Sequence, residues 1–205
     1  SGASSLIDLR DAATVKDVLD AINFETGINV TATTQGDSIV LSDNTGQTSS
    51  NLIVQQVGIA TTASDLGLSG VNAAANQATG SDIVSLSRNT LLSSLNDGNG
   101  VDFHASLAEL QVTFRDNSAA LDLNFVNEKT LGELLDTINA ADSARLTAQI
   151  SSDGDRIELT DLTSDSGGTF AVSNLYSATT AADLGLDTTA SGGTLSGRRV
   201  LGGLG

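Results

Sequence analysis

The chain has 205 residues, of which 39% are apolar and 17% are charged, so it has enough apolar material for a folded core. Its formal net charge of −16 argues against nucleic acid and anionic membrane surfaces as partners, because both would repel it. No apolar run is long enough for a membrane span, and the absence of cysteine excludes disulfides and thiolate metal sites.

Residues 14–23 form the first strong pattern, an amphipathic helix. A half-buried strand is expected just before it at residues 7–9, where apolar and polar residues alternate. The spacing i, i+3, i+4, i+7 produces one apolar face made of Val15, Val18, Leu19 and Ile22. Thr14 precedes this run and Asp17 follows three residues later, which is the spacing of an N-terminal capping box. We interpret Asn23 as the C-terminal cap of the helix.

Further strands and a closing turn are expected after this helix. Strands at residues 28–32 and 38–42 flank a Gly-Asp pair typical of a tight hairpin turn, and another strand is expected at residues 51–57. Thr62 and Asp65 then have capping-box spacing, and Gly67 suits the left-handed position that ends a helix. We interpret this block as a single helical turn that closes the first module at residue 70.

Residues 71–106 are interpreted as a connector. The polar run at residues 72–80 predicts a flexible link, residues 83–86 predict a short strand, and the leucines at 91, 92 and 95 predict a short helix. His104 has no carboxylate or serine at a catalytic spacing, so we interpret it as structural or solvated. Asp/Asn/Gly clusters at residues 96–100 and 153–155 lack the ligand pattern of a calcium loop and are interpreted as tight turns.

Residues 107–188 repeat the first module and begin with an additional strand. Residues 107–114 and 119–125 are joined by a turn at residues 115–118, which predicts a β-hairpin. The helix over residues 130–139 begins with the capping pair Thr130 and Glu133, ends at Asn139, and has an apolar face of Leu131, Leu134, Leu135 and Ile138. Strands at residues 146–150, 156–160 and 169–174 follow, and the closing block contains Asp183 and Gly185.

Three blocks of the two modules match in the same order. Residues 14–32 and 130–148 are identical at 7 of 19 positions, residues 36–43 and 154–161 at 5 of 8, and residues 60–68 and 178–186 at 8 of 9. We therefore predict an α+β fold of two repeated modules, each a short capped helix packed on an antiparallel sheet. The modules span residues 1–70 and 107–188, and residues 189–205 are expected to begin a further, truncated connector.

Alignment of the two copies places Ser1 inside the hairpin turn, so the first module lacks the first strand of that hairpin. We expect the chain to be a fragment of a longer protein with further copies of the module. The missing strand would leave an exposed sheet edge at residues 4–9, where a neighbouring chain can pair.

The repeated pattern Thr-Leu-x-x-Leu-Leu-x-x-Ile-Asn, then Leu-Thr-Ala-x-Ile, a Gly-Asp turn and an Ile-x-Leu strand, resembles the flagellin hook IN motif, which is named for the Ile-Asn pair. The closing Ala-x-Asp-Leu-Gly-Leu is also similar to that family of flagellins, hook-associated proteins and filament-cap proteins. The resemblance implies an extracellular structural module of a bacterial flagellum, with other flagellar subunits or further copies of the module as partners. Polymerising flagellar proteins carry long heptad-patterned terminal helices, which this sequence lacks. The resemblance therefore implies the outward-facing part of such a protein.

No pattern in the sequence predicts a catalytic, cofactor or metal site, so we expect a protein without enzymatic activity that serves in assembly and display. The alternative is a cell-surface adhesin or recognition repeat, including an ion-dependent one. The residues singled out here are expected to hold the fold together: Thr14, Leu19, Ile22, Asn23, Asp65, Gly67, Thr130, Leu135, Ile138, Asn139, Asp183 and Gly185.

Overall fold

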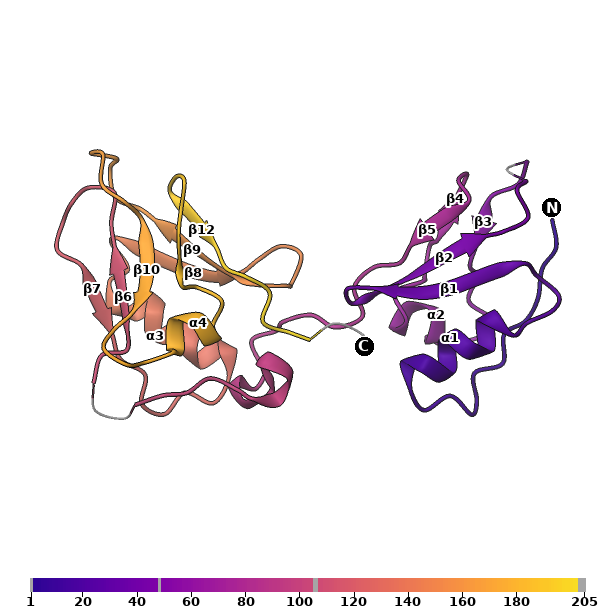
Figure 1. The fold of residues 1–205 in the computed structure, drawn as a ribbon, viewed down its shortest axis with the longest axis horizontal. Helices are drawn as coiled ribbons and strands as arrows, with labels where there is room; N and C mark the ends of the chain where they lie inside the picture. The colour runs from indigo at the N-terminus through magenta and orange to yellow at the C-terminus, as the bar shows by residue number, and fades with distance from the viewer. Residues whose placement is uncertain (1, 48, 105–106, 203–205) are drawn as a thin grey trace. The chain divides into compact units, whose positions relative to one another are not determined.

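The computed structural model describes residues 2–47, 49–104 and 107–202, which form two compact units (Figure 1). Unit 1 comprises the residues up to Val84, and unit 2 comprises Ser85–Gly202. Each unit combines short helices with antiparallel sheets, so the predicted α+β class is confirmed.

Unit 1 is a helix packed on a three-stranded sheet, with a two-stranded sheet beside it. The helix α1 (Val15–Asn23) contacts β1 (Val30–Gln35), which pairs with β2 (Ser38–Asp43), which pairs with β5 (Gln77–Thr79). The smaller sheet joins β3 (Leu52–Ile53) to β4 (Asn72–Ala73), and α2 (Thr62–Asp65) is a single turn between them in sequence. The core lies between helix and sheet and contains Val18, Ile22, Ala32, Ile39, Leu41 and Leu68.

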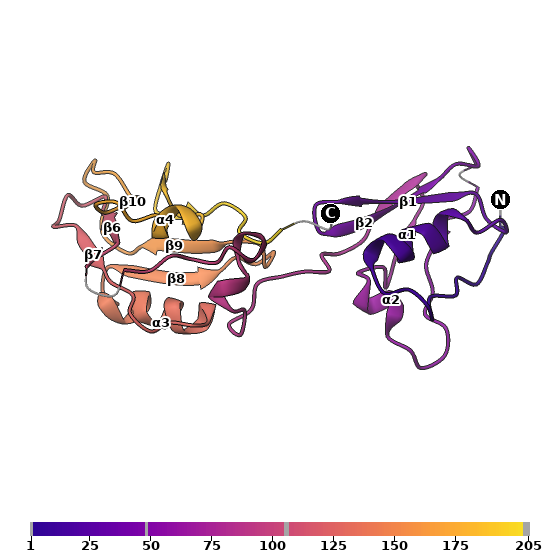
Figure 2. The same ribbon diagram turned by 60° about the horizontal axis from the view of Figure 1, so that its bottom comes forward.

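Unit 2 has the same plan with more strands. The helix α3 (Leu131–Ala141) lies along one face of the sheet formed by β8 (Leu146–Ile150), β9 (Ile157–Asp161) and β12 (Thr194–Ser196) (Figure 2). A second sheet has the order β11-β10-β6-β7, from β11 (Thr188–Thr189), β10 (Ala171–Asn174), β6 (Leu110–Thr113) and β7 (Leu121–Leu123). Two short 3₁₀ helices, η1 (Leu92–Ser94) and η2 (Asn96–Gly98), precede these strands, and α4 (Thr180–Asp183) follows β10.

The repeat is visible element by element. The sheet β1-β2-β5 corresponds to β8-β9-β12, the helices α1 and α2 correspond to α3 and α4, and the pair β3–β4 corresponds to β10–β11. The strand β6 has no counterpart among the described residues of unit 1. The segment that corresponds to β7, residues 5–9, is not a strand, so the predicted strand at residues 7–9 and the predicted sheet edge at residues 4–9 are wrong.

The boundaries of the predicted connector differ from those of the structure. Residues 72–80 are not a flexible link: they contain β4 and β5, and β5 pairs with β2, so this stretch completes unit 1. Residues 83–86 are not a strand, although the Ile83 N–H donates to Asp37 O over 3.0 Å. The leucines at 91–95 lie in and around the 3₁₀ helices. Residues 194–196, expected in a further connector, form the edge strand of a unit 2 sheet.

The cores of the two units differ in their large side chains. Phe114, Phe125 and Phe170 of unit 2 are at most 2% exposed. Leu9 and Leu52 stand at the positions of Phe125 and Phe170 in unit 1, and both are only partly buried. Unit 1 is therefore the more thinly packed of the two.

Candidate functional site

Both predicted capping boxes are present. The Asp17 N–H donates to Thr14 Oγ1 over 3.2 Å, and the Thr14 N–H donates back to Asp17 Oδ2 over 2.9 Å. Thr130 and Glu133 make the same pair of bonds over 3.3 and 3.0 Å. Backbone hydrogen bonds, first that from Lys129, lower the pKa of Glu133, as expected for a carboxylate that stabilises a helix N-terminus.

The predicted apolar face of the second helix is fully buried. Leu135 and Ile138 are 2% and 0% exposed, beneath the sheet of β8 and β9. In the first helix Ile22 is buried, whereas Leu19 is only partly buried. The side chains of the same sequence pattern are therefore more completely buried in unit 2 than in unit 1.

The two asparagines of the Ile-Asn pairs do not cap their helices, so that interpretation is wrong. The C-cap of α1 is Phe24 and that of α3 is Asp142. The Asn23 side chain instead bonds to the backbone of β1: Ala32 N–H donates to Asn23 Oδ1 over 2.6 Å, and Asn23 Nδ2 donates to Ala32 O over 3.0 Å. A side-chain amide presents an N–H donor and a C=O acceptor side by side, so it can pair with a strand as another strand would.

Asn139 makes the same two bonds to Ala148 of β8. The Ala148 N–H donates to Asn139 Oδ1 over 2.7 Å, and Asn139 Nδ2 donates to Ala148 O over 2.9 Å. We call each of these arrangements the asparagine clamp. Each clamp joins a helix to the strand beside it. The common spacing of Asn23 to Ala32 and Asn139 to Ala148 is the sequence signal that could have revealed it.

The Asp-Leu-Gly-Leu blocks end short helices, as predicted, but their threonine partners differ from the prediction. Asp65 and Asp183 accept hydrogen bonds from the hydroxyls of Thr61 and Thr179, over 2.7 and 2.8 Å. Neither helix has a side-chain capping bond, so the predicted box between Thr62 and Asp65 does not form. The residue before the predicted cap occupies the N-cap position instead.

Gly67 and Gly185 have the left-handed conformation predicted for them, with φ of +67° and +69°. The following leucine N–H groups donate back across the turn, from Leu68 to Ala63 O and from Leu186 to Ala181 O, each over 2.7 Å. A Cβ at Gly67 would lie 2.1 Å from Ser81 O, so the position also requires close backbone approach.

Glu109 is a buried carboxyl group that the sequence pattern did not single out. It is 0% exposed, and it accepts hydrogen bonds from the His104 backbone N–H and, over 3.3 Å, from Thr180 Oγ1. Burial raises its pKa, against the effect of those bonds. The His104 side chain is about half exposed, with Nδ1 4.0 Å from Glu109 Oε1. Glu109 thus links His104 to Thr180 of α4, whose single hydroxyl proton is shared with Asp102 O at 2.9 Å.

A second missed contact links the β6–β7 hairpin to β9. Asp161 is 3% exposed and accepts from the Arg115 N–H over 2.8 Å and from Arg115 Nε over 3.3 Å. Burial alone would raise the pKa of Asp161, but hydrogen bonds from Thr163 and Arg115 outweigh it and lower that pKa. Asp43 is the counterpart of Asp161 in unit 1. It accepts from the Thr45 N–H over 2.8 Å, which corresponds to the bond from the Thr163 N–H to Asp161.

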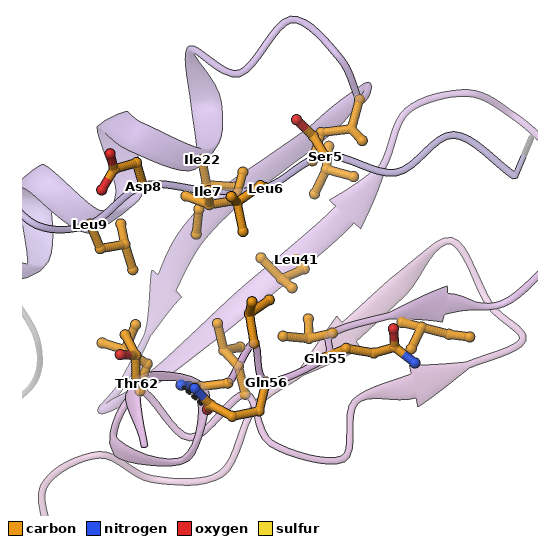
Figure 3. Close-up of a pocket in the computed structure, with 18 of the residues that line it drawn as sticks. Ser5, Leu6, Ile7, Asp8, Leu9, Ile22, Leu41, Gln55, Gln56 and Thr62 are labelled. Carbon is orange, nitrogen blue, oxygen red and sulfur yellow. Dashed lines mark hydrogen bonds between the residues drawn. The ribbon is translucent and has the colours of Figure 1, made fainter. Parts of the chain in front are cut away.

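Unit 1 contains an apolar groove of about 770 Å³ (Figure 3). One wall is residues 5–10 and the opposite wall is residues 52–57. Ile22, Leu41 and Leu68 of the core contribute to its lining, and Thr62, Ala63 and Leu66 of the α2 region close one side. Asp8 and Arg10 at the rim pair with each other. The groove therefore offers apolar surface and backbone groups rather than a cluster of reactive side chains.

No described helix exceeds 11 residues, and none combines the length and apolarity that crossing a bilayer requires. Comparison with models of known protein families, with curated proteins and with solved structures finds no match to this chain. The residues and their geometry are therefore the whole basis for a functional proposal.

Proposed function

We propose that the chain is a structural, non-catalytic part of an extracellular bacterial flagellar protein of the flagellin or hook-associated type. The observation that carries the proposal is the asparagine clamp. In both units the Asn of the Ile-Asn pair bonds to the backbone of an alanine nine residues later, and the preceding Ile lies in the core. The residues that carry the resemblance to the hook IN motif thus have a defined mechanical role.

The other repeated residues also serve the fold. Thr14 and Thr130 cap helices, Gly67 and Gly185 end short helices, and Asp65 and Asp183 bond to neighbouring threonines. When an internal repeat preserves caps, clamps and turns, the property that is repeated is the module itself. This pattern supports a role in building or displaying an assembly, with other flagellar subunits or further module copies as partners.

Peptide mass spectrometry on appendages sheared from the source cells tests the proposal. We expect peptides of this chain to be enriched together with flagellin in the sheared fraction, relative to the washed cell surface. A strain that cannot export flagellar proteins is the matched control and should lose the signal. Equal amounts on the stripped surface of both strains would contradict the proposal and favour a cell-surface adhesin instead.

A further inference from the structure

The centre of the four-stranded sheet in unit 2 is β6. It pairs with β7 through Leu110↔Leu123 and Val112↔Leu121, and with β10 through Leu110↔Asn174 and Val112↔Val172. Its inward side chains are buried: Leu110 and Val112 are 0% exposed and Phe114, just after the strand, is 2% exposed. β6 therefore forms hydrogen bonds to both neighbouring strands and contributes a large share of the buried apolar side chains.

The groove of unit 1 lies between the counterparts of these two neighbours. One hydrogen bond identifies the wall formed by residues 52–57: Gln56 Oε1 accepts from the Ala63 N–H over 2.8 Å, as Asn174 Oδ1 accepts from the Ala181 N–H over 2.7 Å. On the other wall, Ile7 and Leu9 match the inward positions of β7 and the residue that follows it, Leu123 and Phe125. Figure 3 shows Ile7 and Leu9 on one wall, Gln56 on the other, and Leu41 between them.

The two walls do not bond to each other. Among the described residues, no backbone hydrogen bond joins residues 5–10 to residues 53–57. Residues 54–57 are not a strand, although residues 51–57 have the sequence expected of one. Leu52 and Ile53 pair with β4 on their other side, and the Val54 N–H donates to Val71 O over 3.0 Å. A segment in the place of β6 would pair with both walls, as β6 pairs with β7 and β10 in unit 2.

The apolar residues around α2 are also left uncovered. Thr180, Ala181 and Leu184 of unit 2 are all 0% exposed. Their counterparts Thr62, Ala63 and Leu66 are exposed or only partly buried, and all three line the groove. The same sequence block is thus covered in one unit and open in the other.

We propose that this groove of unit 1 binds one extended strand of a partner polypeptide, in the place that β6 occupies in unit 2. Pairing by strand addition would use backbone groups for affinity and alternate side chains for specificity. The proposal goes beyond the flagellar assignment and does not rest on it, because it follows from the comparison of the two units.

The comparison also defines the chemistry of the partner strand. Three apolar side chains at alternate positions, as in Leu110, Val112 and Phe114, should enter the groove. The backbone one residue before the first apolar position should bond to both walls, because the Glu109 N–H donates to Leu123 O and the Leu175 N–H donates to Glu109 O, each over 2.8 Å. Ile7 O and the Val57 N–H are the corresponding groups of unit 1.

Charge complementarity predicts that the partner strand has an arginine directly after its third apolar residue. In unit 2 that position is Arg115, which donates to the buried Asp161. Asp43 is the corresponding acid in unit 1, and within the described chain no lysine or arginine side chain is paired with it. A partner strand of the type Leu-x-Val-x-Phe-Arg would supply that charge.

A synthetic peptide with the sequence of residues 107–116, added to the full chain, tests the proposal. Hydrogen exchange measured residue by residue should slow by about tenfold at residues 5–9 and 54–57 when the peptide is at about ten times its Kd. Amides of β6 and β10 should be unaffected, which shows that the peptide has not replaced β6. The control peptide carries Leu110→Asn and Val112→Asn and should give no protection.

Two variants of the chain distinguish binding in the groove from non-specific binding. Val54→Asn, which alters a residue that lines the groove, should abolish protection, whereas Ile59→Asn, which alters a fully exposed residue outside the lining, should leave it unchanged. An Arg115→Gln peptide should bind the parent chain more weakly than the unaltered peptide does. The two peptides should bind the Asp43→Asn chain equally well. Equal protection by all peptides would overturn the proposal.

A fusion protein distinguishes a strand supplied by a partner chain from a strand of the same chain. It also remains informative if one of the chain variants fails to fold. A copy of residues 107–116 placed directly before Ser1 should raise the urea midpoint of unit 1, and the fusion carrying Leu110→Asn and Val112→Asn should not. If neither the fusion nor the added peptide acts, the groove is not a strand site. If the fusion acts but the free peptide does not, the partner-chain proposal is overturned, and the strand must come from the same polypeptide.

Discussion

The asparagine clamp leads to the sharpest prediction about this fold. Replacing Asn139 with alanine removes the bonds to Ala148 N–H and Ala148 O, and Ala148 is only 7% exposed. A typical hydrogen bond contributes about 1 kcal/mol net, and a buried group left without a partner costs about 1–3 kcal/mol. Asn139→Ala should therefore lower the free energy of unfolding of unit 2 by about 2–4 kcal/mol.

The repeat supplies a matched variant. Asn23→Ala removes the bonds to Ala32, which is 2% exposed, so it should destabilise unit 1 by a similar amount. Urea titration followed by NMR resonances of each unit can measure both effects separately. Each variant should shift the midpoint of its own unit.

Gln149→Ala is the control for the Asn139 experiment. Gln149 lies on β8 beside Ala148, is exposed, and makes one long side-chain bond of 3.4 Å to Glu158. Its removal should cost less than about 0.5 kcal/mol. If Asn139→Ala costs no more than Gln149→Ala, the clamp does not hold the helix to the strand, and the argument from the Ile-Asn pair fails.

Leu135→Ala should destabilise unit 2 by about 2–5 kcal/mol in urea unfolding, because the side chain is 2% exposed, and Leu19→Ala should cost unit 1 less. Burial raises the pKa of Glu109, so the neutral carboxyl is favoured in the folded state, and stability falls as pH rises above the ordinary glutamate range. Glu109→Gln should remove this component, seen as a smaller loss of unit 2 stability between acidic and neutral pH than in the parent chain. Gly58→Ala should cost about 1–2 kcal/mol for its positive φ alone, since open space surrounds it. Gly67→Ala should cost unit 1 more, because its Cβ would meet Ser81 O; equal midpoints for the two glycine variants would contradict this reasoning.

The features predicted correctly are those that neighbouring residues decide. Thr130 caps α3 because Glu133 lies three residues away, and Gly67 is left-handed because no side chain opposes that conformation. The apolar faces of the helices were readable for the same reason: a period of 3.6 places Leu135 and Ile138 on one side.

The features predicted wrongly depend on distant partners. Residues 72–80 are polar and lack apolar alternation, yet the run forms β4 and β5, because strands pair through backbone groups that leave no mark on composition. The frequent use of asparagine at helix C-termini favours Asn23 and Asn139 as caps, whereas the position of β1 and β8 beside each helix decides their bonds.

The α+β class and the local helix signals are readable from the sequence because they arise from spacings within about ten residues, and the two-fold repeat is readable from matching segments more than a hundred residues apart. The sequence also predicted that the first strand of the hairpin at residues 107–125 has no counterpart within residues 1–70 of the first module. Only the tertiary structure decided the consequence: an open apolar groove, flanked by two segments that remain unpaired with each other. The reason is that a strand needs a neighbour, and whether residues 54–57 have one depends on a segment far away in sequence.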